Sequence, residues 1–494
     1  MTSRALALAA VLLVGCGVQQ PNDVHVRRAQ IRPTDGDGWN GNGYAAGTTV
    51  DRVDAPGGKV RMHYARDGAD AVPAADADSD GVPDFVSRFA AIFGEVYDFE
   101  TTQLGFREPL DDSAYHDRPD FGGDGRFDVY LKDQGGGADG YAVKEACASG
   151  TPRRCAGYMV VENDFKGYAY PTPEDGMKIL ASHEFFHMVQ AAYSDALGSA
   201  FSEGTAVWAT EKLYPEQKDF EGFIKHFFSD SARPIDDKPK SPADLFVYGA
   251  AIWPMFLDQR FGKDIVPAIF EELGKGQSSS AADAADAVLA RDHQSSLAEA
   301  FGEMALWNLL TGDRAVSGKG YKEAASYPQV TVEDVAGSHP LRISGEIAYL
   351  SARYYRVKAD DKTRITVTVE REQPKLMLHL VTGDKSDPLI VSGKPEEDEL
   401  SIDARGDVII IAASTARRDK QLPLSLAVRG SAIDKPPVNP PPPDPDPDPN
   451  GGGGGCAVAS IAPANTLVFF FAALLLLGFR QRERQRRRVS RGRA

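Results

Sequence analysis

Two histidines four positions apart carry the clearest chemistry in this sequence. His183 and His187 flank Glu184 in a segment with a helical pattern, so both imidazoles project from one face. Two such nitrogens can take adjacent corners of a tetrahedral zinc site, and Glu184 can hold and deprotonate the water beside the metal. The neighbouring positions are apolar, so a buried pair of histidines needs a reason. The alternative is that both are ordinary core residues.

The third ligand separates the classes of zinc site. A metzincin would have Gly and His where this chain has Gln190 and Tyr193. Fifteen residues separate His187 from Glu203, which opens the string EGTAVW; this string resembles the glutamate helix of gluzincin metallopeptidases. The resemblance implies that Glu203 completes the zinc site. Glu211 is the competing ligand, although a salt bridge with the adjacent lysine is its simpler role.

The resemblance to gluzincins covers roughly residues 75–315 and implies a zinc-dependent peptidase in which Glu184 is the general base. It departs from thermolysin-like enzymes at Val207, where those enzymes carry an Asp that supports a histidine. The residues that hydrogen-bond to the zinc-binding histidines must then come from another part of the chain. The resemblance also extends to Tyr248, which would stabilise the oxyanion; the alternatives are that Tyr248 only packs, or that His226 takes this part.

A second ion site is expected in the acidic loop before the first helix. Carboxylates stand at positions one, three, five and nine, with Gly81 at position six permitting a sharp turn. This spacing suits calcium and resembles the D-x-D-x-D-G loops of secreted proteins. Position twelve is Ser87, where an EF-hand has Glu; the alternative is a solvated acidic loop. The candidate ligands are Asp76, Asp78, Asp80, Val82 and Asp84.

The two ends of the chain indicate export. Residues 1–16 have a basic start and an apolar run that is typical of a signal peptide, and their end resembles a bacterial lipobox with lipidation at Cys16. Residues 456–479 begin at Cys456 and have the length of a membrane span, followed by a basic tail that should stay cytoplasmic. This order resembles the MYXO-CTERM sorting signal, with processing near Cys456. In an exported chain, Cys147 and Cys155 are expected to form a local disulfide.

The pattern between the ends predicts an α+β domain followed by an all-β sandwich and a C-terminal transmembrane helix, and the gluzincin resemblance implies that the α+β domain is a zincin-like metallopeptidase. Helices are expected at 85–99, 175–195, 203–213, 245–261, 264–274 and 281–310, and strands include 127–131, 158–161 and a run at 348–350. The expected order is a signal peptide (1–16), a leader or loose arm (17–60), the zinc metallopeptidase domain (61–325), a β-sandwich (335–430), a Pro/Asp/Gly-rich linker (431–455), a transmembrane sorting segment (456–479) and a basic tail (480–494).

Charge limits the partners. The chain has a formal net charge of -16 although its tail is basic, so nucleic acid is excluded as a partner on electrostatic grounds. The expected function is cleavage of a protein or peptide substrate by a zinc enzyme at the cell envelope. Two alternatives stay open: a surface binding or adhesion protein on a metallopeptidase scaffold, and a zinc hydrolase acting on a non-peptide substrate.

Overall fold

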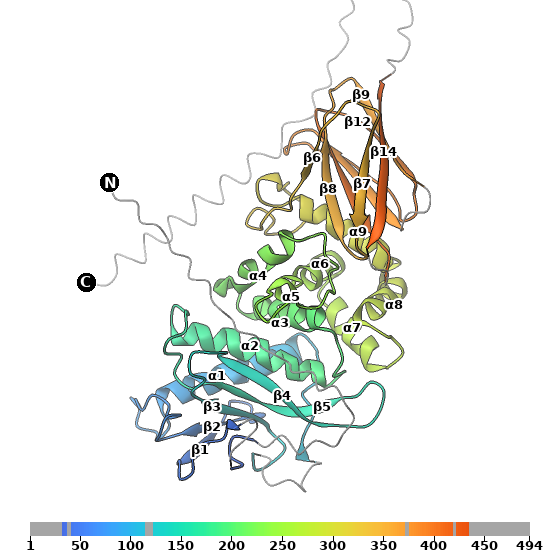
Figure 1. The fold of residues 1–494 in the computed structure, drawn as a ribbon. Coiled ribbons are helices and arrows are strands. Elements are labelled where there is room, and N and C mark those ends of the chain that lie inside the picture. Colours follow the sequence, from blue (N-terminus) through green and yellow to red (C-terminus); the bar gives the residue numbers. More distant parts are fainter. Residues whose placement is uncertain (1–31, 37–40, 114–121, 371–374, 418–420, 434–494) are drawn as a thin grey trace, which may run out of the picture. The chain divides into compact units, whose positions relative to one another are not determined.

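The computed structural model describes residues 32–36, 41–113, 122–370, 375–417 and 421–433. Most helices lie in the middle of the chain, between an N-terminal and a C-terminal group of strands, which confirms the α+β class (Figure 1). The α-helices are α1 (Asp84–Asp98), α2 (Pro173–Ala191), α3 (Ser199–Leu213), α4 (Asp219–Phe228), α5 (Phe246–Gly249), α6 (Ile252–Phe261), α7 (Ile265–Gly274), α8 (Ala281–His293) and α9 (Leu297–Leu309).

Five strands form the N-terminal sheet in the order β1-β2-β3-β5-β4. They are β1 (Val50–Asp54), β2 (Val60–Ala65), β3 (Phe127–Lys132), β4 (Gly140–Cys147) and β5 (Cys155–Glu162). The central strands β2, β3 and β5 run parallel, whereas β4 pairs antiparallel with β5 at one edge. An edge strand leaves a row of backbone groups available for pairing with another chain.

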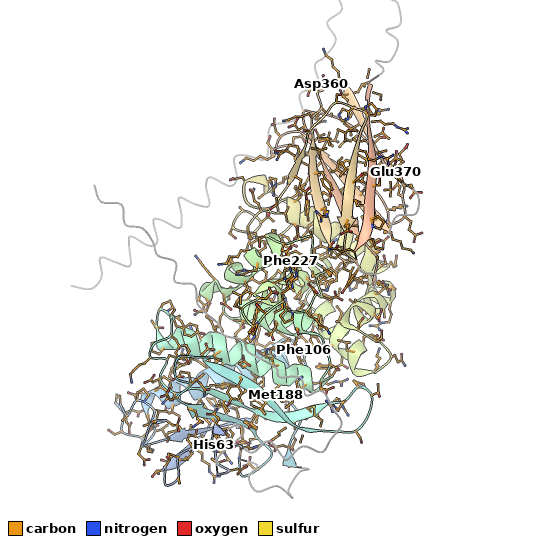
Figure 2. All side chains as sticks on the ribbon, in the orientation of Figure 1. His63, Phe106, Met188, Phe227, Asp360 and Glu370 are labelled. Carbon is orange, nitrogen blue, oxygen red and sulfur yellow. A yellow bond between two sulfur atoms is a disulfide. The ribbon has the colours of Figure 1, made fainter. Side chains whose placement is uncertain are left out.

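Alternation along β2 separates the two faces of this sheet. Met62 and Tyr64 pack into the main core with α1 and α2, while His63 points to the other face and stacks on Tyr130 with ring centroids 4.5 Å apart. Figure 2 labels His63 on the sheet and Met188 on α2, which packs on the helix-covered face. The helix that carries the histidine pair is therefore held against the sheet by a continuous apolar layer.

The folded region begins before residue 61. Strand β1 pairs with β2 along its whole length, and Arg32 is 1% exposed among the carboxylates of Asp112, Asp128 and Glu145. A buried arginine is retained only with such partners. Residues expected as a leader or loose arm thus contribute a strand and a buried cation to the first sheet.

The expected single helix at 281–310 is wrong, because the chain breaks into α8 and α9. Gln294 adopts a left-handed conformation with φ 52°, and Ser296 then caps α9 by accepting a hydrogen bond from the backbone N–H of Glu299. A Ser three residues before Glu is a helix start signal, and the break could have been predicted from it. The expectation also lacked α4 entirely.

The C-terminal strands form two sheets that share one core. One sheet has the order β11-β10-β13-β8-β6 and the other β12-β9-β14-β7. The strands are β6 (Glu333–Val335), β7 (Leu341–Ile347), β8 (Ala352–Val357), β9 (Thr363–Val369), β10 (Leu376–Thr382), β11 (Leu389–Ser392), β12 (Glu399–Asp403), β13 (Val408–Ser414) and β14 (Leu422–Ala432). The expected strand at 348–350 is wrong, since Leu350 has φ 42°, which a strand does not allow.

One face of the five-stranded sheet packs against α9 rather than facing water. The hydroxyl of Tyr354 donates a hydrogen bond to the carbonyl of Ala305 at 3.0 Å. Nε2 of His379 lies 2.9 Å from the carbonyl oxygen of Gly302, and the His379 side chain is buried. The strand region and the helical region are therefore joined by specific polar contacts within an apolar layer.

Cys16, Cys456 and the expected membrane span lie outside the described residues. Within the part of the chain that the structure describes, no helix combines the length and apolar character needed to cross a bilayer.

Candidate metal centre

Helix α2 is buried on nearly every side, and its start is strongly fixed. The hydroxyl of Thr172 accepts from the N–H of Asp175, the Asp175 carboxylate accepts from the Thr172 N–H, and Pro173 occupies the first helical position. From Met177 onward most residues are buried, including His183, Glu184 and His187, which are 6%, 1% and 1% exposed. The helix thus presents its imidazoles inside the protein rather than to bulk water.

Helix α3 supplies the third residue of the site. Oε2 of Glu203 lies 3.1 Å from Nε2 of His183 and 3.4 Å from Nε2 of His187. Tetrahedral zinc with ligand bonds of about 2.0–2.1 Å separates its ligand atoms by roughly 3.3 Å. Both distances are close to that edge length, so the carboxylate lies where a third ligand of such a site would lie.

Gln190 fixes which nitrogen of His187 faces the carboxylate. The Nε2 amide of Gln190 donates to the carbonyl of Ser202 and the hydroxyl of Thr205, so its Oε1 faces Nδ1 of His187 at 3.0 Å. Nδ1 then carries a proton, so the lone pair of the neutral ring, the form that binds a metal, lies on Nε2. That atom is buried and has no hydrogen-bond partner among the described residues, as expected of a metal ligand.

Burial and charge oppose each other at this cluster. Burial disfavours the charged imidazole, but the carboxylate of Glu203 outweighs it and raises the pKa of His187 to about 9. Burial likewise favours neutral Glu203, yet the two histidines lower the pKa of its carboxyl to about 2. The site therefore keeps Glu203 ionised, which is the state that binds a cation.

Glu184 points toward the edge strand of the sheet. Its Oε2 accepts a hydrogen bond from the backbone N–H of Ala142 in β4 at 3.1 Å. One ligand atom each from Glu184, His183 and His187 lies within 4.8 Å of the others. The carboxylate is thus held between the histidine pair and the strand, where it can reach a water bound beside them.

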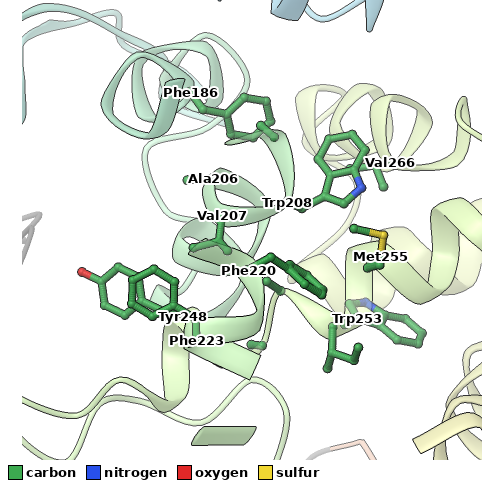
Figure 3. Packing of buried hydrophobic residues seen from close by; sticks show 14 of the residues in the cluster. Phe186, Ala206, Val207, Trp208, Phe220, Phe223, Tyr248, Trp253, Met255 and Val266 are labelled. Carbon is green, nitrogen blue, oxygen red and sulfur yellow. The ribbon is translucent and has the colours of Figure 1, made fainter. Parts of the chain in front are cut away.

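Tyr248 borders the same histidine. Its ring stacks on His183 with centroids 5.8 Å apart and on Phe223 with centroids 5.0 Å apart. Figure 3 shows the Tyr248 and Phe223 rings overlapping, with the Tyr248 hydroxyl directed away from the apolar cluster. Tyr248 therefore both packs and presents a donor near the site. His226, the alternative to Tyr248, lies on α4 and is half-buried. Burial lowers the pKa of its imidazole.

Gly204 on α3 lies against the turn between α5 and α6, which follows Tyr248: a Cβ there would meet the backbone of Ala250 and Ala251 at 3.0 Å. The expected pairing of Glu211 with Lys212 is absent from the described contacts, because Lys212 pairs with Asp258 at 2.8 Å. Burial and neighbouring carboxylates raise the pKa of Glu211 to about 8.

The acidic loop converges on a point of its own. Ligand atoms of Asp76, Asp78 and Asp84 lie within 4.8 Å of one another. Oδ1 of Asp76 is buried without a hydrogen-bond partner among the described residues. Asp80 instead accepts from the backbone N–H of Val82 at 2.7 Å. The structure thus brings three of the expected ligands together and uses Asp80 to shape the turn.

A disulfide joins Cys147 to Cys155 across directly paired positions of β4 and β5. The hairpin that it closes is tied to the loop after α2, since the Asp195 N–H donates to the Arg153 carbonyl at 2.9 Å.

Sequence reasoning missed two residues near the candidate metal centre. Gln190 could have been found from its place one turn after His187, whereas Lys144 lies in β4, a strand that the pattern did not reveal.

Comparisons with known proteins add no identification. No family model and no curated protein matches the chain. Among solved structures, a periplasmic lysozyme inhibitor of g-type lysozyme, PliG from Aeromonas hydrophila, is 19% identical, covers 20% of this chain and 96% of its own, and has a TM-score of 0.17. The pre-peptidase C-terminal domain of a Bacillus anthracis collagenase is 13% identical, with 20% and 95% covered and a TM-score of 0.16. Likenesses this low carry no argument about fold or function.

Proposed function

We propose that this protein is a zinc-dependent peptidase with a zincin-like domain followed by a β-sandwich. The observation that carries the proposal is the Glu203 carboxylate at 3.1 and 3.4 Å from Nε2 of His183 and His187, with Glu184 beside the histidine pair. Two imidazoles and one carboxylate with an open fourth position is the donor set of catalytic zinc. A zinc ion held there would activate a water molecule and polarise a scissile carbonyl.

The surrounding residues have separate tasks in this proposal. Glu184 accepts the proton of the attacking water and delivers it to the leaving amine, while the N–H of Ala142 orients its carboxylate. The hydroxyl of Tyr248 donates to the developing oxyanion. Gln190 holds His187 in the tautomer that leaves Nε2 free for the metal.

Strand β4 supports a peptide as the substrate. It is the edge of its sheet in the described part of the chain, and it runs beside Glu184. An extended peptide can add to such an edge through main-chain hydrogen bonds, which places successive residues in register with the strand. The scissile bond would then lie at the level of Ala142.

We also propose calcium in the loop of Asp76, Asp78 and Asp84, supported by the buried and unpartnered Oδ1 of Asp76. Export and anchoring at the cell envelope remain part of the proposal. They rest on residues 1–16 and 456–494 of the sequence, and a disulfide in the described domain is consistent with an oxidising compartment.

The test compares the full-length wild type with Glu184→Gln and with a control, Glu174→Gln, on the same helix. Glu174 is exposed and pairs with Arg88, so its loss should leave catalysis intact. We expect one zinc per chain in all three proteins and casein hydrolysis reduced about 10²–10⁴-fold only in Glu184→Gln. Zinc with no cleavage of any peptide would favour a non-peptide substrate, and absence of zinc would overturn the site.

A further inference from the structure

Lys144 brings a positive charge to the candidate metal centre. It lies on β4 two residues beyond Ala142, so the two side chains share one face of the strand by alternation. The negative charge of Glu203 acts on Lys144 and favours its ammonium form. The residue is half-buried, so part of it remains accessible.

The protein provides little counter-charge for this ammonium. Nζ of Lys144 donates to the backbone carbonyl of Asp195 at 3.2 Å, while the Asp195 carboxylate is held by Nε of Arg153 at 2.6 Å. The Asp195 carboxylate is thus paired with Arg153, and Glu203 would be neutralised by a metal. Burial lowers the pKa of Lys144, which reflects the cost of a charge that lacks a full partner.

The opposite end of the same strand is acidic. Asp139 directly precedes β4 and is 3% exposed, and Asp219 at the start of α4 is half-buried. Both carboxylates interact electrostatically with His183. Carboxyl groups therefore lie near the start of β4 and the Lys144 ammonium near the disulfide hairpin, where the neighbouring Glu145 is already paired with Arg32.

We propose that Lys144 binds a carboxylate of the substrate, so that peptides with an acidic group beyond Ala142 along β4 are preferred. This inference rests on the proposed function. The carboxylate can come from an acidic side chain or from the C-terminus of the peptide, since both offer the same acceptor. An ammonium with three donors and one backbone acceptor has the capacity to bind it. A solely structural lysine would need no such spare donors.

The test uses the full-length zinc-loaded protein and fluorogenic peptides in matched pairs. One series replaces Gln by Glu at each position in turn, and a second compares a free C-terminal acid with its amide, which separates the two sources of the carboxylate. We expect one acidic peptide to have a KM about tenfold or more below its neutral partner. Lys144→Gln should bring the two KM values together, Lys144→Arg should keep the difference, and Lys144→Glu should favour a Lys-containing peptide.

Controls separate recognition from structure and from the peptidase proposal itself. Lys178→Gln, which removes a lysine paired with Glu174 and Glu216 on the outer part of α2, should keep the preference. A wild type that cleaves without preference, or a Lys144→Gln variant that raises both KM values equally, would overturn the inference. If the wild type cleaves nothing, fluorescence anisotropy of the same labelled peptides measures their binding instead. Tighter binding of the acidic peptide that is lost in Lys144→Gln would support the role of Lys144, and equal binding of both peptides would overturn it.

Discussion

Nε2 of His183 lies 3.1 Å from Oε2 of Glu203, a residue 20 positions further along the chain. Neither residue could reach the other without the packing of α2 on α3, which places both in a nearly dry interior. An ionised carboxylate is costly to bury unless cations surround it. The pairing therefore explains why the two helices carry charged groups into a core that is otherwise aromatic and aliphatic.

Gln190→Ala should weaken zinc binding without unfolding the protein. The amide of Gln190 sets the tautomer and the orientation of His187, and loss of such an outer partner typically costs about 10–100-fold in metal affinity. Competition with a chromophoric chelator measures this change. Gln217→Ala is the control, because Gln217 contacts Asp175 at the start of α2 and no histidine. Equal zinc affinity in wild type and Gln190→Ala would contradict the assigned role.

Gly157→Ala should destabilise the protein by about 3 kcal/mol, the upper end of the usual range for overpacking. A Cβ at Gly157 would lie 1.8 Å from the backbone oxygen of Val143 and 2.9 Å from Cε of Met188. Strand β4 would have to move, and with it the N–H that holds Glu184. Urea unfolding measures the loss. The control is Gly222→Ala at an exposed position of α4, where a Cβ would have no atom within 4 Å. This variant should gain up to about 1 kcal/mol of stability.

Calcium should raise the melting temperature, and Asp76→Asn should remove that effect. Asp76 contributes a buried oxygen to the loop, so its neutral analogue loses the charge that attracts the ion. At a calcium concentration 100 times Kd, the stabilisation should be about 2.7 kcal/mol. Thermal unfolding with and without calcium checks this. Asp361→Asn, on the exposed surface of the C-terminal sheets, should respond like the wild type; an unchanged response in Asp76→Asn would argue for a solvated loop.

The sequence was informative where chemistry and periodicity coincide. The helix that carries His183 and His187 follows from its periodicity, whereas Glu203 was expected from a resemblance, and α3 begins at Ser199, four residues before the expected start. The sequence did not reveal features that depend on tertiary contacts. Strand β4 alternates only weakly because it lies at an edge, so Lys144 gave no signal, and Gly204 serves a neighbour that no local pattern reveals. These contacts depend on packing between segments distant in the chain.

Acid should weaken the contact between α9 and the adjacent sheet through His379. Burial in an apolar layer lowers the pKa of His379 to about 4, below the 6.5 of an exposed histidine, and outweighs the contact with the Gly302 carbonyl at 2.9 Å, which raises it. The folded state therefore binds fewer protons than the unfolded state between these values. Its contribution is complete above pH 6.5 and is lost as the pH falls toward 4.

The expected loss is about 2 kcal/mol at pH 5 relative to pH 7, from the separation of the two pKa values. Urea unfolding at the two pH values measures it, and His379→Gln isolates it from the other titrating groups. Glutamine keeps a donor for the Gly302 carbonyl but does not titrate, so the variant should lose about 2 kcal/mol less than the wild type on acidification. Equal losses in both proteins would show that the pKa of His379 does not change on folding, which would contradict the effect assigned to its burial.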